Sequence, residues 1–158
     1  EKLVENYYGA IADTCDYAAS RGIGISVKPH GGLNATGPQC RRTIERIGHA
    51  NFGLWYDPGN IFYYSDGRLD PVDDAATVDG LVVGMSVKDY LHPRRVDVTP
   101  GTGQVRFPQV MERLRRGGFM RGPLIVETLA PGELPALLAE ARKARALLEA
   151  LTATPAAV

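Results

Sequence analysis

Four short apolar segments, separated by stretches with helical spacing, constrain the fold of this chain more than any other feature. They cover residues 23–28, 51–57, 81–89 and 123–129. Each is apolar at successive positions, which is typical of parallel strands that are covered by helices. Strands that alternate with helices in this way predict an α/β fold with a parallel sheet.

Apolar residues at helical spacing predict one helix before the first strand and one after every strand. The expected helices cover residues 3–20, 38–47, 70–80, 107–119 and 133–151. Each strand–helix unit spans about 30 residues, the usual length of a βαβ repeat. Residues 152–158 follow the last helix, and we expect them to form a disordered tail.

Two parallel-sheet architectures fit this order of elements. One is a small open, doubly wound domain, and the other is half of an eight-stranded barrel. Both folds place their functional sites at the carboxyl ends of the strands. The residues that follow the four strands are therefore the first place to look for a site, whichever architecture is right.

Composition and charge exclude several classes of function. Eighteen basic residues balance eighteen acidic ones, so no excess charge points to nucleic acid or to an anionic membrane. No apolar run approaches the roughly 20 residues that cross a bilayer. The two cysteines, Cys15 and Cys40, lack the spacing of metal ligands. We therefore expect reduced thiols in a cytoplasmic protein.

Every predicted strand ends in ionisable side chains. Lys28 and His30 stand at the end of the first strand, Asp57 at the end of the second, Lys88 near the end of the third and Glu127 near the end of the fourth. Unpaired charge is costly at the end of a buried strand, so four such coincidences at one edge of a sheet favour a functional site. Structural interpretations remain open: a Lys28–Glu127 ion pair, a bond from His30 to a loop carbonyl, Asp57 in a turn, and solvated Lys88 and Asp89.

Five motifs come in an order and at a spacing that resemble a known family. They are "KPHGG", "WYDPGN", "VKDY", "GTGQVRFPQV" and "LIVETL". Together they resemble the C-terminal half of a sugar phosphate isomerase/epimerase of the xylose-isomerase-like TIM-barrel superfamily. The resemblance implies that residues 1–151 supply the last four βα units of a (β/α)8 barrel. It also implies a partner, either a missing N-terminal half-barrel or a second copy of the chain.

The resemblance further implies one divalent metal, Mn, Zn, Mg or Fe, in the mouth of the barrel. Asp57 and Glu127 match the expected ligands on the second and fourth strands of this chain. Lys28 stands where a glutamate is expected, and Ser86 stands where a histidine is expected. A lysine ammonium and a divalent metal ion repel each other at short range. Either Lys28 takes the place of the metal, or His30 joins Asp57 and Glu127 in a set that suits Mn, Zn or Fe.

The function implied by the resemblance is isomerisation or epimerisation of a sugar or polyol through proton abstraction next to a carbonyl. Glu127 and Lys28 are the expected catalytic residues. The expected substrate-binding residues are His30, Lys88, Asn60 and Trp55. Two alternatives remain, a lyase or dehydratase that acts on a keto-sugar at the same site, and a non-catalytic sugar- or protein-binding barrel with a degenerate metal site.

Overall fold

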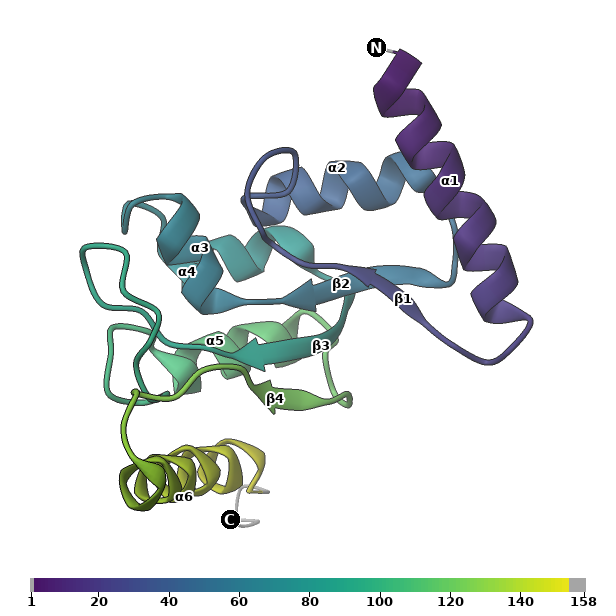
Figure 1. Ribbon diagram of the computed structural model, residues 1–158. Coiled ribbons are helices and arrows are strands. Elements are labelled where there is room, and N and C mark those ends of the chain that lie inside the picture. The colour runs from purple at the N-terminus through teal and green to yellow at the C-terminus, as the bar shows by residue number, and fades with distance from the viewer. Residues whose placement is uncertain (1, 154–158) are drawn as a thin grey trace.

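The structure is a computed structural model that describes residues 2–153 of the chain (Figure 1). In chain order its elements are α1 (Lys2–Ala19), β1 (Ile25–Val27), α2 (Gly37–Ile47), β2 (Phe52–Tyr56), α3 (Pro58–Tyr64), α4 (Pro71–Ala75), a 3-10 turn (Ala76–Val78), β3 (Val82–Val87), α5 (Phe107–Arg116), β4 (Leu124–Val126) and α6 (Leu134–Thr152). The four predicted strands are thus all present, and each is followed by at least one helix.

The sheet is parallel throughout, and its strands lie in the order β1-β2-β3-β4. Each strand therefore pairs with the next strand along the chain. A doubly wound sheet reverses its strand order at a switch point, whereas a β/α barrel adds its strands one after another around the ring. This sequential order favours the half-barrel over the open doubly wound domain.

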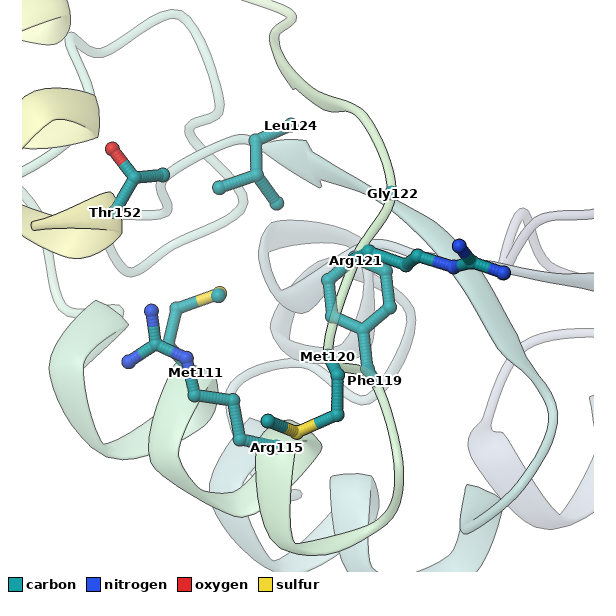
Figure 2. A pocket seen from close by; sticks show the side chains of 8 residues that line it. All are labelled: Met111, Arg115, Phe119, Met120, Arg121, Gly122, Leu124 and Thr152. Carbon is teal, nitrogen blue, oxygen red and sulfur yellow. The ribbon is translucent and has the colours of Figure 1, made fainter. Parts of the chain in front are cut away.

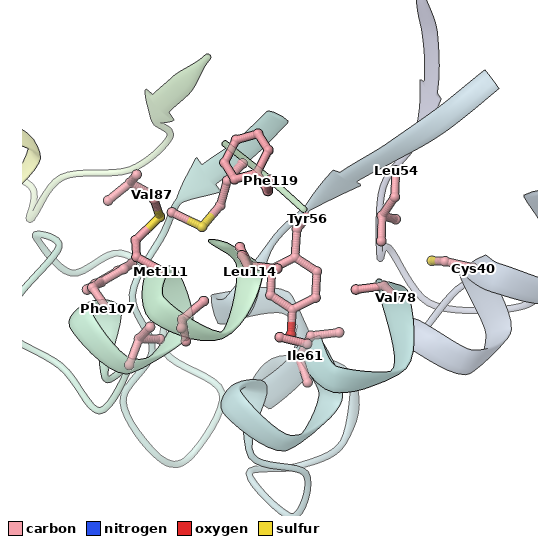
Figure 3. Close-up of a cluster of buried hydrophobic side chains, with 14 of the residues drawn as sticks. Cys40, Leu54, Tyr56, Ile61, Val78, Val87, Phe107, Met111, Leu114 and Phe119 are labelled. Atoms are coloured by element: carbon pink, nitrogen blue, oxygen red, sulfur yellow. The ribbon is translucent and has the colours of Figure 1, made fainter. Parts of the chain in front are cut away.

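The hydrophobic core lies between the sheet and the helices that follow it. Leu54 and Tyr56 of β2 and Val87 of β3 are buried against helical side chains such as Phe107 and Leu114, as Figure 3 shows. In Figure 1, α2 to α5 lie on one face of the sheet, whereas α1 lies near β1 and α6 lies on the β4 side. Because side chains alternate along a strand, one face of each strand packs into this core.

The opposite face of the sheet is open in the part of the chain that the structure describes. Val83 of β3 is 48% exposed and Ile125 of β4 is 51% exposed. Apolar side chains of this size are normally buried in the interior of a complete barrel. In a complete barrel, this concave face of the sheet would meet the opposite wall.

The outer strands are shorter than the sequence pattern predicts. The predicted strand 23–28 contains only Ile25–Val27, and the predicted strand 123–129 contains only Leu124–Val126. Each of these strands has a hydrogen-bonded neighbour on one side only, so their ends lack the second ladder that would extend them. The inner strands, β2 and β3, lie within the predicted segments and are longer.

One helix is absent from the prediction. The Asp57-Pro58-Gly59-Asn60 sequence suggested a turn, but it opens α3. The Asp57 side chain accepts a hydrogen bond from the Asn60 backbone N–H at 2.9 Å, and Pro58 occupies the first turn. An aspartate cap followed by proline is a normal helix start, and here it places Asp57 at the junction of β2 and α3.

The C-terminal boundary also differs from the prediction, because α6 continues to Thr152. The rest of the predicted tail, residues 154–158, lies outside the described residues. Cys15 and Cys40 are both free and buried. Among residues 2–153, no helix combines the length and the apolar character needed to cross a membrane.

Candidate active site at the carboxyl ends of the strands

Four charged residues meet at one edge of the sheet, and each is the first residue after its strand. Lys28 follows β1, Asp57 follows β2, Lys88 follows β3 and Glu127 follows β4. Lys88 Nζ lies 3.0 Å from Glu127 Oε1, Lys28 Nζ contacts Glu127 Oε2, and Lys28 Nζ lies 2.9 Å from Asp57 Oδ2. The structure therefore joins the four predicted residues in one chain of ion pairs, which we name the mouth network.

The mouth network is anchored at its ends and accessible in its middle. Asp57 is fully buried and Lys88 is nearly so. The side chains of Lys28 and Glu127 are 25% and 30% exposed. A ligand that enters the mouth would therefore meet the Lys28–Glu127 pair first.

Asp57 uses its two oxygens differently. Oδ1 accepts the hydrogen bond from Asn60 N that begins α3. Oδ2 is buried and has no aligned hydrogen-bond donor among the described residues. The ammonium of Lys28, at 2.9 Å, is therefore a charge contact to this oxygen. Burying an ionised carboxylate costs free energy unless an opposite charge compensates it. The ammonium of Lys28 is the main compensation for burying Asp57.

Burial and neighbouring charges set the ionisation of this network. Desolvation raises the pKa of Asp57 against the opposing attraction of Lys28. Desolvation alone would lower the pKa of Lys28, but Asp57 and Glu127 outweigh it and raise that pKa. Desolvation alone would raise the pKa of Glu127, but Lys28, Ser86 and Lys88 outweigh it and lower that pKa to about 2. These contacts favour the ammonium form of Lys28, which donates hydrogen bonds.

Trp55 forms part of the concave face below the mouth. Its indole Nε1 donates a hydrogen bond to Ser86 Oγ at 3.0 Å. The ring lies against Gly84, where a Cβ atom would collide with it. Trp55 therefore offers a flat apolar surface next to the charged network, and Ser86 is buried beneath it.

His30 and Asn60 lie on the β1 side of the site. His30 Nδ1 is 3.0 Å from the hydroxyl of Tyr64 in α3, and His30 is exposed. Asn60 is only 2% exposed, and its side-chain amide donates to Pro29 O at 2.7 Å. The structure thus leaves His30 beside the mouth, whereas it uses Asn60 to tie the loop after Lys28 to α3.

The side chains as placed do not fit the divalent metal that the sequence resemblance implies. The described residues contain no group of three His, Cys, Asp or Glu side chains that could hold a metal ion. His30 is turned toward Tyr64, and both oxygens of Glu127 contact ammonium groups. The unpartnered Asp57 Oδ2 is the one feature here that suits a cation, and the Lys28 ammonium already faces it.

Asp89 has a role that the sequence analysis missed. It is fully buried, and its carboxylate accepts hydrogen bonds of 2.8–2.9 Å from four backbone N–H groups. The donors are Tyr90, Gly101, Gly103 and Val105. A Cβ at position 103 would collide with the carboxylate. The "GTG" sequence therefore wraps the loop between β3 and α5 around Asp89, and this pairing of an aspartate with a later glycine-rich loop is the signal that could have revealed it.

Cavities lie on both sides of the mouth network. A cavity of about 430 Å³ runs along β1 and includes Lys28 and His30, and one of about 510 Å³ runs between β4 and α6 and includes Glu127. A smaller pocket of about 170 Å³, shown in Figure 2, is lined by Met111 and Leu124 among others. It lies at the amino end of β4, away from the charged residues, and is not part of this site.

Solved structures of three proteins share this fold. They are a xylose isomerase domain protein from Planctomyces limnophilus, a D-psicose 3-epimerase, and a protein from Bacillus anthracis described as the probable 3-DHS dehydratase, with TM-scores of 0.72, 0.73 and 0.70. Sequence identities are 22%, 14% and 16%, so the likeness shows the fold alone. The matches cover 93%, 91% and 90% of this chain but only 51%, 54% and 55% of those chains. The chain thus spans about half the length of these proteins.

The sequence itself also carries the family signal. None of the curated protein sequences compared with the chain matches it. A sequence model of the family described as xylose isomerase-like TIM barrel, however, matches residues 1–153. This agrees with the sequential parallel sheet and confirms the predicted half-barrel. The chain therefore belongs to the xylose isomerase-like TIM barrel family.

Proposed function

We propose that this chain carries the C-terminal half of the active site of a sugar or polyol isomerase or epimerase. The proposal rests mainly on one observation, the mouth network of two carboxylates and two ammonium groups at the carboxyl ends of all four strands. Membership of the family supports it. Structural neighbours that are sugar epimerases support the same class of reaction.

The chemistry that suits this network is removal of a proton next to a carbonyl group. Such a step needs a base for the proton and positive charge for the oxygen that becomes negative. Glu127 is ionised and can accept the proton. The ammonium groups of Lys28 and Lys88 can donate hydrogen bonds to the carbonyl oxygen and stabilise the enediolate that forms.

Substrate binding would also activate the base. In the free protein, both oxygens of Glu127 are held by lysines, which makes it a weak base. A substrate oxygen that takes over one of these hydrogen bonds weakens the hold on Glu127. The pKa of Glu127 then moves back toward the ordinary value of about 4.3 for glutamate, and its affinity for the proton rises when the substrate is in place.

Trp55, His30 and Lys88 have positions suited to binding a sugar. Asn60 is buried, and its side-chain amide is bound to Pro29 O. The indole of Trp55 offers a flat face for the C–H groups of a sugar. His30 lines the same cavity as Lys28, and Lys88 pairs with Glu127, so both can offer polar contacts. The same enediolate could be reprotonated, giving an isomer or epimer, or could lose a neighbouring hydroxyl, giving a dehydrated product. The similar fold of the probable 3-DHS dehydratase keeps the second outcome as an alternative.

The test is exchange of the substrate's α-proton with solvent deuterium, followed by NMR in D2O. It uses the full-length protein that contains this chain and a panel of ketoses and their phosphates. We expect exchange on at least one member of the panel. Exchange on none would contradict the proposal.

A second candidate function is a barrel that binds sugars or proteins without catalysis. It is favoured by Lys28 and Ser86, which stand where the sequence resemblance implies metal ligands. Saturable binding of a ketose, measured by calorimetry and accompanied by no deuterium exchange, would support this second function instead.

A further inference from the structure

The ammonium of Lys28 occupies the space between the two carboxylates of the mouth. Its Nζ contacts Glu127 Oε2 and lies 2.9 Å from Asp57 Oδ2. These two carboxylates come from strands that are not neighbours, β2 and β4. The ammonium therefore links the two sides of the half-barrel.

The rest of the network completes this arrangement. The second oxygen of Glu127 contacts Lys88 Nζ at 3.0 Å, and Lys88 is nearly buried. Two ammonium groups and two carboxylates leave no net charge in the network. A divalent cation would have to displace one ammonium from between the carboxylates and then remain beside it, at a large Coulomb cost.

We propose that the Lys28 ammonium is a built-in cation of this mouth, and that it excludes a divalent metal from the space between Asp57 and Glu127. This inference deepens the proposed function, because it assigns the positive charge that the enediolate needs to a side chain instead of a metal. An ammonium has three N–H donors. Two of them face the carboxylates, which leaves one for the carbonyl or hydroxyl oxygen of a ligand.

The inference makes a single residue responsible for metal exclusion. Lys28→Glu removes the ammonium and adds a third carboxylate next to Asp57 and Glu127, which is an oxygen-rich set suited to Mn²⁺. Lys28→Gln removes the charge without adding a carboxylate. Lys88→Glu is the matched control, because it changes the charge of the network by the same amount but leaves Lys28 in place.

The experiment is a titration of the full-length protein with Mn²⁺ alone, followed by electron paramagnetic resonance of the free ion. We expect no saturable binding to the unsubstituted protein or to Lys88→Glu up to about 1 mM Mn²⁺. We expect Lys28→Glu to bind one Mn²⁺ with an affinity at least tenfold higher than the limit of about 1 mM set by the unsubstituted protein. This corresponds to a gain in binding free energy of about 1.4 kcal/mol or more. Lys28→Gln is expected to bind Mn²⁺ weakly, between these limits, and circular dichroism checks that all variants are folded.

Two results would overturn the inference. One is stoichiometric Mn²⁺ binding by the unsubstituted protein that involves Asp57, as shown by its loss in Asp57→Asn. The other is equal Mn²⁺ binding by Lys28→Glu and Lys88→Glu, which would mean that only the overall charge matters. These readouts do not use activity, so a protein without deuterium exchange that still behaves as expected toward Mn²⁺ would contradict the proposed function alone.

Discussion

Glu127 is the residue on which the proposed chemistry depends most directly. We expect Glu127→Gln to reduce turnover by about a hundredfold or more, the usual contribution of a general base, because an amide cannot take up the substrate proton. The free energy of unfolding should also fall, by about 1–3 kcal/mol, because the substitution leaves the nearly buried Lys88 without its carboxylate partner. Steady-state kinetics and thermal unfolding measure both quantities.

The matched control for this variant is Glu133→Gln, an exposed glutamate beyond the same strand. It should leave turnover unchanged. Full activity in Glu127→Gln would show that another group takes the proton.

Asp74 is a buried carboxylate outside the site, and it predicts how stability depends on pH. It accepts hydrogen bonds from Gly37 N at 2.9 Å and from the hydroxyl of Tyr56 at 3.1 Å. Burial nevertheless raises its pKa to about 6. Because the folded pKa lies above the unfolded value of about 3.9, the folded protein loses stability as pH rises from about 4 to 6, by about 3 kcal/mol.

We therefore expect Asp74→Asn to be more stable than the unsubstituted protein at pH 7 and to lose much of this pH dependence. Asparagine keeps an acceptor for Gly37 N and avoids burying a charge. Urea unfolding between pH 4 and 7 is the measurement, and Asp73→Asn, at the exposed neighbouring position, is the control. Equal pH dependence in both variants would show that Asp74 is not the group responsible.

At the residue scale, the sequence indicated which charged side chains meet and offered the Lys28–Glu127 ion pair as one interpretation. It did not indicate the contacts of Lys28 with Asp57 and of Lys88 with Glu127. Lys28, Asp57 and Glu127 could be identified because each interrupts an apolar run. The direction of His30 could not be predicted, since its partner Tyr64 belongs to α3, which the pattern did not reveal. Tertiary contacts of this kind leave no local signal in the chain.

At the scale of elements, the loop between β3 and α5 depends on Asp89. We expect Asp89→Asn to destabilise the protein by about 2–4 kcal/mol, because the amide group would face backbone N–H donors and leave them without an acceptor. The loop should also become a site of rapid proteolysis. Limited proteolysis and urea unfolding test this, with Asp97→Asn, an exposed position on the same loop, as the control that should show neither effect.

The helices and strands were predictable where the spacing of hydrophobic residues was regular. They were less predictable where a single residue determined whether a helix began. The four strands appear in the predicted places because each apolar run is too short for a helix and alternates with segments of helical spacing. The start of α3 was missed because Pro58 and Gly59 resemble a turn, although Asp57 before a proline is equally a helix cap. The helical backbone hydrogen bond from Ile61 N to Asp57 O, at 3.1 Å, separates these two interpretations.

At the scale of the whole molecule, the half-barrel leaves apolar surface at both edges and on its concave face. Leu3 of α1 is 81% exposed and Leu134 of α6 is 68% exposed, in addition to Val83 and Ile125 on the open face. In a complete barrel, the apolar side chains on the concave face would be covered by the opposite wall. The outer strands also have free edges that invite pairing.

We therefore expect the isolated 158-residue chain not to behave as a stable monomer. Size-exclusion chromatography with light scattering should show a dimer or larger species, and a separately produced N-terminal half-barrel should convert it to a one-to-one complex. Ile125→Glu should weaken the association, whereas Met120→Glu, an exposed apolar position at the other end of β4, should not. A well-folded monomer at all concentrations would contradict this prediction.

The overall architecture was the part that local patterns alone could not decide. Both candidate folds have the same order of strands and helices along the chain. They differ in which strands are neighbours, and this is a property of pairing between distant segments. The resemblance of several spaced motifs resolved the choice in the sequence, and the strand order resolves it in the structure.

The composition of the mouth network has a consequence for synthesis of the protein. Lys28 and Glu127 are separated by 99 positions in the chain, and each of the four charged residues comes from a different strand. A ribosome releases β1 well before β4, so the nascent chain carries Lys28 and Asp57 long before their partner Glu127 exists. Any product truncated before the last strand therefore lacks the base. The order of translation therefore keeps the proposed chemistry switched off until the whole segment has been made.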